Sequence, residues 1–333
     1  MRPKYMMARS PGPPGRLPAS DNVPQRARRG TACEGSLEAP SESFHPPWVA
    51  VMFSGMIPLP ILDDGLPAPP AESPQELRDR LSRTLLKTVG EHALIEAGDR
   101  ILVAVSGGKD SYTLLDILAR ARKKAPVHFE LVAVHLDQGQ PGYDGRPLAQ
   151  WLAECGETFE ILHEDTYSIV LQQAEDDASY CAPCSRMRRG ILYTAAARLG
   201  CNKIALGHHR DDALETLLLN LLYAGRLQAM PARYRTNDGR FEVIRPLLEC
   251  AESDIVRHAR EAGYPIVPCR LCGSQPNGKR DRAAALLAQL EREIPNVRTV
   301  MLAALKNVRP THLLDREVAE AWEAASGKFA PRK

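Results

Sequence analysis

A glycine-rich hexapeptide follows directly on the apolar run 101–105 and has the residue types that hold phosphate. It consists of Ser106, Gly107, Gly108, Lys109, Asp110 and Ser111. The glycines let the backbone turn tightly and expose its N–H groups, and a helix beginning at Ser111 adds partial positive charge. We expect Lys109, Ser106 and Ser111 to contact phosphate oxygens, and Lys109 and Asp110 are the candidate catalytic residues. The alternative is a turn that only joins a strand to a helix.

A second polar cluster follows the predicted strand 203–207 and contains His208, Asp211 and Asp212. Because the carboxyl ends of parallel strands share one edge of a sheet, we expect this cluster to lie near the hexapeptide. Carboxylates there can hold Mg²⁺ beside a phosphate. These three residues are therefore our candidates for Mg²⁺ or nucleotide binding. The alternative is a helix N-cap and a surface carboxylate.

Four of the eight cysteines form two CxxC pairs, Cys181 with Cys184 and Cys269 with Cys272. We expect each pair to lie in a proline-containing loop, and two such loops can converge on one metal. Spacing alone leaves a structural zinc site and an iron–sulfur cluster open, with redox dithiols as a third possibility. The remaining cysteines, which lack this spacing, are interpreted as packing or surface residues: Cys33, Cys155, Cys201 and Cys250.

The elements that must position these residues alternate between strand and helix patterns after position 73. Strands are predicted at 101–105, 130–135, 159–162, 203–207 and 243–245, and helices at 111 onward, 148–155, 185–199, 212–223 and 253–262. Such alternation predicts an α/β fold with a doubly wound, mostly parallel sheet and helical flanks. Ser73 followed by Pro74 marks the first helix.

Composition divides the 333 residues into three parts. Residues 1–72 hold more than half of the 27 prolines and little periodic apolar pattern, which predicts a disordered Pro/Arg-rich extension. We expect one α/β domain over 73–315, with the cysteine pairs inside it, and a short tail over 316–333. The net charge of +2 makes no global case for nucleic acid. No segment reads as a signal peptide or a membrane span, so we expect a cytoplasmic protein.

Four motifs, in this order, resemble the tRNA 2-thiocytidine synthetase family of PP-loop ATP pyrophosphatases. They are the hexapeptide at 106–111, CAPCSRMRRG at 181–190, GHHRDD at 207–212 and PCRLCGSQPN at 268–277. The resemblance covers about 77–313 and implies the fold of the adenine nucleotide alpha hydrolases. It implies adenylation of C2 of cytidine 32 in the tRNA anticodon loop by ATP with Mg²⁺, and release of AMP and pyrophosphate.

The same resemblance implies that sulfur replaces the C2 oxygen through a 4Fe-4S cluster with three cysteine ligands. Cys181 and Cys184 carry over as two of them, and the third is placed at Cys272, with Cys269 as the alternative. Further implications are tRNA as partner, a cysteine desulfurase as sulfur donor and a homodimer. Six basic residues beside the cysteine pairs are candidates for tRNA contact, with a solvated face as the alternative: Arg186, Arg188, Arg189, Lys279, Arg280 and Arg282.

Other functions remain open on the motifs alone. Lysidine synthetases share the phosphate loop and a similar histidine–aspartate cluster, but they do not need paired CxxC loops, so a related ligase with structural zinc is one alternative. Thiouridine synthetases with zinc ribbons carry CxxC pairs near both termini, whereas this N-terminal part holds only Cys33. A non-catalytic iron–sulfur RNA-binding protein would leave the phosphate loop idle.

Overall fold

The computed structural model describes residues 72–173, 181–267 and 278–326. These residues belong to the unit Pro69–Lys333. The extension predicted over 1–72 lies outside the described residues except for Glu72, as do Cys269 and Cys272. Among the described helices, none is long and apolar enough to cross a membrane.

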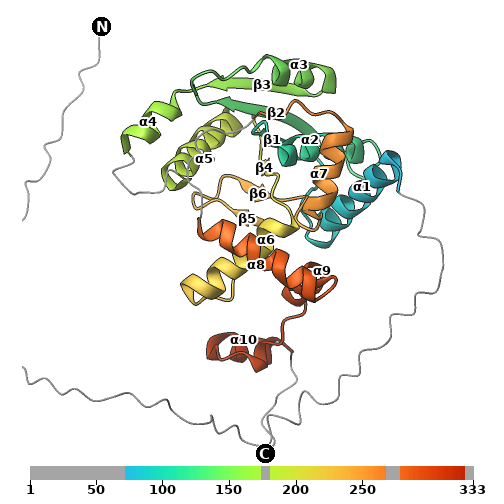
Figure 1. Ribbon diagram of the computed structural model, residues 1–333, viewed down its shortest axis with the longest axis vertical. Helices are drawn as coiled ribbons and strands as arrows, with labels where there is room; N and C mark the ends of the chain where they lie inside the picture. Colours follow the sequence, from blue (N-terminus) through green and yellow to red (C-terminus); the bar gives the residue numbers. More distant parts are fainter. Residues whose placement is uncertain (1–71, 174–180, 268–277, 327–333) are drawn as a thin grey trace, which may run out of the picture. The chain divides into compact units, whose positions relative to one another are not determined.

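Six strands form one sheet in the order β3-β2-β1-β4-β6-β5. Their bounds are β1 (Arg100–Val105), β2 (Glu130–Asp137), β3 (Thr158–His163), β4 (Lys203–Ala205), β5 (Arg233–Arg235) and β6 (Glu242–Ile244). All neighbours pair in parallel except β5, which is antiparallel to β6 (Figure 1). The chain winds outward from β1 to β2 and β3, and then returns to β4 on its other side. This confirms the predicted doubly wound sheet and places a switch point between β1 and β4, where such folds bind ligands.

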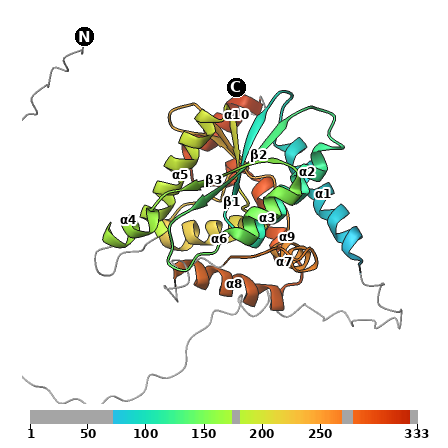
Figure 2. The same ribbon diagram turned by 90° about the horizontal axis from the view of Figure 1, so that it is seen from above.

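Helices cover both faces of the sheet. They are α1 (Pro74–Glu91), α2 (Lys109–Arg122), α3 (Arg146–Cys155), α4 (Thr166–Gln173), α5 (Cys181–Arg198), α6 (Arg210–Leu219), α7 (Glu252–Glu261), α8 (Lys279–Glu293), α9 (Val297–Lys306) and α10 (Arg316–Ser326). Figure 2 shows α5 on one side of the sheet and α1, α2 and α3 on the other. A short π-helical turn (Asn220–Ala224) extends α6, and a 3₁₀ turn (Pro310–His312) precedes α10.

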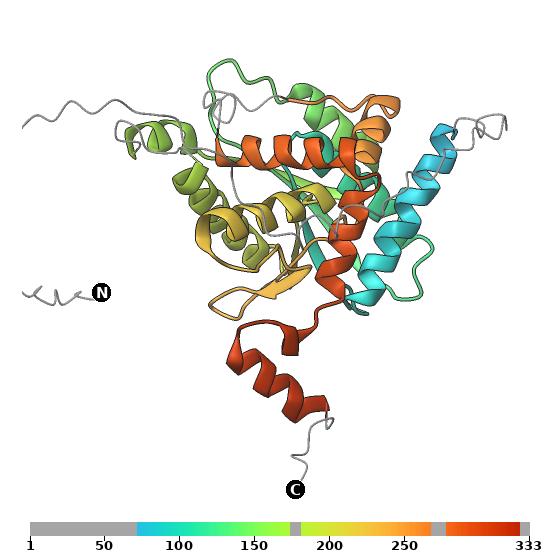
Figure 3. The same ribbon diagram turned by 60° about the horizontal axis from the view of Figure 1, so that its bottom comes forward.

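The apolar core follows the alternation along β1. Ile101, Val103 and Val105 join the cluster that contains α1, α2, α3 and α7, while Leu102 joins the cluster beneath α5. A third, smaller cluster joins α6 to α8 and α9, which lie across it in Figure 3. The sheet therefore has helices packed on both faces, as a largely parallel sheet requires.

Two polar clusters lie away from the ligand-binding edge, one among the strand ends of the sheet and one between α2 and α7. The Lys203 ammonium lies 2.8 Å from Asp99 and 3.4 Å from Glu242. Asp116 of α2 accepts hydrogen bonds from Tyr264 at 2.9 Å and lies 3.1 Å from His258 of α7. In both clusters each carboxylate has a hydrogen-bond donor or a cation beside it, which offsets the free-energy cost of removing the carboxylate from water.

The observed elements differ from the predicted ones in several places. Helix α2 begins at Lys109 instead of Ser111, because Gly108 is the extended N-cap residue. The expected loop around Cys181 and Cys184 was wrong: these residues form the first turn of α5, where Pro183 needs no N–H partner. Neither α4 nor the edge strand β5 was predicted. Part of the expected C-terminal tail forms α10.

Candidate active site

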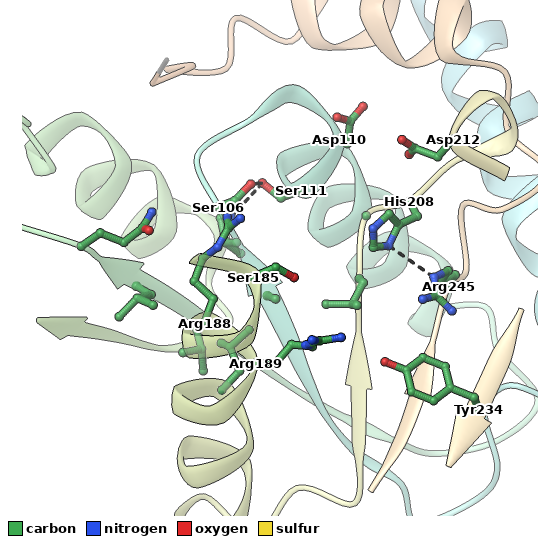
Figure 4. Close-up of a pocket in the computed structure, with 18 of the residues that line it drawn as sticks. Ser106, Asp110, Ser111, Ser185, Arg188, Arg189, His208, Asp212, Tyr234 and Arg245 are labelled. Carbon is green, nitrogen blue, oxygen red and sulfur yellow. Dashed lines mark hydrogen bonds between the residues drawn. The ribbon is translucent and has the colours of Figure 1, made fainter. Parts of the chain in front are cut away.

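A pocket of about 470 Å³ lies at the carboxyl edge of the sheet, beside the switch point. Residues from seven separate segments of the chain line it, and Figure 4 shows most of them as sticks. The polar residues that line it are Ser106, Asp110, Ser111, Gln138, Ser185, Arg188, Arg189, His208, Asp212, Tyr234, Arg245 and Arg280. The structure thus brings the hexapeptide, the helix α5 that begins with the first CxxC, and the GHHRDD cluster to one cavity.

The hexapeptide forms the turn that its glycines predict. Gly107 has φ of +85°, which favours glycine, and its carbonyl accepts a 2.9 Å hydrogen bond from the amide of Val267. The Ser111 hydroxyl donates to the Gly108 carbonyl at 2.9 Å and accepts from the Ser106 amide at 3.1 Å. No side chain caps the start of α2, so its first N–H groups can bind an anion.

Gly207 holds the second cluster against this turn. A Cβ atom at Gly207 would lie 3.0 Å from the carbonyl carbon of Asp110 and 3.1 Å from the amide nitrogen of Ser111. Only a residue without a side chain allows so close an approach of the two backbones. The connection between β4 and α6 therefore touches the start of α2, which explains why His208 reaches the same pocket.

The predicted catalytic lysine does not line the pocket. The Lys109 ammonium lies 3.0 Å from Asp110 and 2.9 Å from Glu252 at the start of α7. Burial opposes its charge, but these two carboxylates outweigh burial and raise the pKa of Lys109. Lys109 is therefore a cation that ion pairs with Asp110 and Glu252 hold beside the phosphate turn.

The two neighbouring aspartates of the GHHRDD motif have different surroundings. Asp212 lines the pocket, and Arg280 of α8 pairs with it at 2.7 Å. Asp211 is buried outside the pocket, where it accepts hydrogen bonds from the amide of Glu252 at 2.8 Å and from Arg298 at 2.7 Å. Asp211 thus joins α6 to α7 and α9, and it is not brought to the site with Asp212.

Two carboxylates of the pocket, Asp110 and Asp212, lie on either side of His209. The Oδ1 atom of Asp110 is buried and accepts no hydrogen bond within the described residues, although the Lys109 ammonium is near. His209 lies between the two carboxylates, with its Nε2 3.5 Å from an oxygen of Asp110 and 3.5 Å from one of Asp212. Hard carboxylate oxygens suit Mg²⁺, so Asp110 and Asp212 fit this ion better than Asp211 does.

His208 lines the pocket beside an arginine that no sequence motif indicated. Arg245 follows β6 and donates from Nε to His208 Nδ1 at 3.3 Å, and its guanidinium lies over the ring of Tyr234 (Figure 4). Burial, with the charge of Arg245, lowers the pKa of His208 to about 4. Tyr234 lies on the unpredicted edge strand β5 and Arg245 directly follows β6; neither belongs to a recognisable motif, so no pattern in the sequence selects them.

The first cysteine pair begins the helix that supplies the pocket's arginines. Cys184 is buried, and its thiol donates to the side-chain oxygen of Gln138 at 3.4 Å. Gln138 also lines the pocket. A buried thiol one turn from a second cysteine fits a soft metal centre. The side chain of Cys181 lies outside what the structure describes, as do both cysteines of the second pair.

The six candidate tRNA contacts separate into two groups. Arg188, Arg189 and Arg280 line the pocket. Arg186 and Arg282 are exposed and do not line it, and Lys279 lies over the ring of Tyr223 at 5.1 Å. Several guanidinium groups around one cavity favour a polyanionic ligand.

Comparison with known proteins gives three findings. Residues 77–267 match a family model described as a PP-loop domain. A tRNA-cytidine(32) 2-sulfurtransferase of Anaeromyxobacter sp. (strain Fw109-5) is 52% identical over 249 residues, covering 75% of this chain and 82% of the relative. The one from Deinococcus radiodurans is 48% identical over 245 residues, covering 74% and 82%. The U34-tRNA thiolase NcsA from Methanococcus maripaludis, solved with its 4Fe-4S cluster, has a TM-score of 0.54 at 20% identity. It covers 77% of this chain and 81% of its own, and it supports the fold.

Proposed function

The chain belongs to the tRNA-cytidine(32) 2-sulfurtransferase family, and we propose that it uses ATP to replace the C2 oxygen of cytidine 32 in tRNA with sulfur. One observation carries the proposal beyond the family name. The phosphate turn, Asp212 and the arginines that follow the first cysteine pair line a single pocket. A nucleotide, an RNA base and a sulfur-carrying centre must meet for this reaction, and this pocket is where the three groups of residues meet.

Activation by adenylation accounts for the need for ATP. The C2 carbonyl of cytosine is a poor electrophile, so its oxygen must first become a leaving group. That oxygen attacks the α-phosphorus of ATP and expels pyrophosphate; hydrosulfide then attacks C2, AMP leaves with the former C2 oxygen, and the sulfur loses its proton. The amides at the start of α2 and the hydroxyls of Ser106 and Ser111 hold the phosphates. Lys109 exchanges its carboxylate partners for phosphate oxygens as charge develops there.

Two metal groups complete the proposed site. Asp110 and Asp212 would hold Mg²⁺, which neutralises phosphate charge. Cys181, Cys184 and a third cysteine, Cys272 or Cys269, would hold a 4Fe-4S cluster, whose fourth iron position supplies the place where sulfur binds. The burial of Cys184 beside Gln138 supports thiolate ligation near the pocket.

The substrate fits the charge of the pocket. Cytidine 32 lies in a single-stranded loop, so its base is accessible without opening a duplex. Arg188 and Arg189 on α5 supply cations for the RNA backbone at the pocket, and Arg280 of α8 also lines it. A cysteine desulfurase as sulfur donor, a homodimer, a cytoplasmic location and a catalytic unit over 73–315 complete the proposal, and they rest on the resemblance and the substrate.

Nucleoside analysis tests this function directly. Deleting the gene should remove 2-thiocytidine from bulk tRNA, as measured by mass spectrometry, and the full-length chain should restore it. Lys109→Ala and Asp110→Ala should fail to restore it, while Lys87→Ala, on the exposed side of α1, should restore it. Loss of lysidine instead, or unchanged 2-thiocytidine, would refute the proposal.

Metal content tests the cluster separately. Anaerobically purified protein should contain about four iron and four sulfide per chain and absorb visible light. Cys184→Ala should lose both iron and colour, whereas Cys155→Ala, outside the CxxC pairs, should keep them. A colourless protein with one bound zinc would contradict the cluster and favour a structural zinc site.

A further inference from the structure

Arg245 is held in one orientation by three neighbours. Its Nε donates to Nδ1 of His208 at 3.3 Å, its NH1 donates to the carbonyl of Pro231 at 2.7 Å, and the guanidinium carbon lies 5.2 Å from the ring centre of Tyr234. Only 7% of the residue is exposed. An arginine fixed in this way at the base of a pocket presents its Nε–H in a constant direction.

This contact fixes where His208 carries its proton. A guanidinium has donors only, so the ring nitrogen that faces it must be the acceptor. A neutral imidazole that accepts at Nδ1 carries its proton on Nε2. Because burial and Arg245 lower the pKa of His208 to about 4, the ring is neutral near pH 7. His208 therefore has one remaining polar group, the Nε2–H.

The Nε2–H group is available at the phosphate turn. Within the described ranges, Nε2 of His208 has no hydrogen-bond partner in the protein, and the residue lines the pocket. The preceding Gly207 touches the backbone of Asp110 and Ser111, so His208 leaves the chain beside the start of α2. A protonated nitrogen can neither bind a metal ion nor accept a proton, but it can donate to an anionic oxygen.

We propose that Arg245 is a positioning residue that fixes the ring of His208, so that Nε2–H donates a hydrogen bond to a phosphate oxygen of the bound nucleotide. The proposal rests on the ATP-dependent function above and deepens it. It gives His208 the role of a donor and leaves the cation to Asp110 and Asp212. Two charged groups across the pocket, Asp212 and Arg280, accompany Arg245 around this histidine.

The proton position can be measured without any turnover. In full-length protein labelled with ¹⁵N-histidine, the His208 signals, assigned by their absence in His208→Gln, should show a protonated Nε2 and a bare Nδ1. Arg245→Met should release the ring and yield a mixture of tautomers, and Arg245→Lys, which keeps a donor, should retain the original pattern. A proton on Nδ1 in the unsubstituted protein, or the same spectrum in Arg245→Met, would overturn the role of Arg245.

Nucleotide affinity tests the donor itself. Gln places an amide N–H near the position of Nε2–H, whereas Leu has no donor. With Mg²⁺ and α,β-methylene-ATP in a calorimeter, His208→Gln should bind within about three-fold of the unsubstituted chain. His208→Leu should bind about ten-fold or more weakly, the value of one hydrogen bond to a charged oxygen.

The outcomes separate this inference from the proposed function. Equal weakening in His208→Gln and His208→Leu, with melting temperatures unchanged, would refute the donor role alone. If the unsubstituted chain bound no nucleotide, the ATP-dependent function would fail first and the donor role would fall with it. Both histidine variants replace a half-buried side chain, so they do not depend on tolerance of a change at the buried Arg245.

Discussion

Replacing Gly207 by alanine should damage the nucleotide site more than the fold. The new methyl carbon would lie 3.0 Å from the carbonyl carbon of Asp110, 3.1 Å from its oxygen and 3.1 Å from the amide nitrogen of Ser111. All three atoms are backbone, so no side chain can rotate away. Relief requires a shift of a few tenths of an ångström at the start of α2, and overpacking of this kind costs about 1–3 kcal/mol.

The same shift misplaces the amides that bind phosphate. We expect Gly207→Ala to melt roughly 2–10 °C lower and to bind Mg²⁺ with α,β-methylene-ATP at least about ten-fold more weakly. Gly90→Ala is the matched control, because a Cβ at Gly90 meets no atom within 4 Å. It lies near the end of α1, where alanine should be neutral or stabilising by up to about 1 kcal/mol. Calorimetry and thermal melts of both variants are the assay. If Gly207→Ala matched the control in both measurements, the close contact between the two motifs would be refuted.

Three further predictions concern separate parts of the molecule. Lys203→Met removes the buried partner of Asp99 and should lower the free energy of unfolding in urea by about 3 kcal/mol; a loss below about 1 kcal/mol would contradict this. For Asp116, hydrogen bonds from a histidine and an arginine outweigh burial and lower the pKa to about 2, below its ordinary 3.8. The ionised Asp116 should therefore add about 2 kcal/mol to the free energy of unfolding above pH 4, and this contribution should disappear as the pH falls towards 2. In urea titrations at these pH values, Asp116→Asn should not show this loss of stability. In tRNA thiolation, Arg188→Ala should lower kcat/KM at least about ten-fold and Arg186→Ala less than about three-fold, since only Arg188 lines the pocket; equal effects would refute the distinction.

The local parts of this site were predictable from sequence because they depend on short-range patterns. The phosphate turn needs an apolar strand, glycines and a helix start in immediate succession, and the structure has all three. The helical position of the first cysteine pair was missed because Pro183 suggests a loop, although proline is tolerated in a first helical turn. Asp211 and Asp212 are adjacent in sequence, but their side chains leave α6 about 100° apart. As a result Asp212 lines the pocket, whereas Asp211 joins α6 to α7.

Long-range contacts could not be predicted in the same way. Arg245 follows a strand of only three residues and has no motif around it, yet it lies beside His208. The distance along the chain between them carries no signal of this contact. Periodicity and spacing describe one segment at a time, whereas the pocket depends on how seven segments meet. The residues that line the pocket could therefore be identified only from the structure.

The C-terminal helices belong to the active site and are not an appendage to the PP-loop domain. The family match ends at 267, but Arg280 of α8 pairs with Asp212 and Arg298 of α9 pairs with Asp211. Asp212 is thus paired with an arginine from beyond the matched domain, and Asp211 has one such partner in addition to the neighbouring Arg210, 3.4 Å away. In sequence, each cysteine pair leads into a helix with a pocket arginine: α5 begins at Cys181 and carries Arg188, and α8 follows the second pair and carries Arg280. A ligand that occupies the pocket therefore meets arginines from both of these helices.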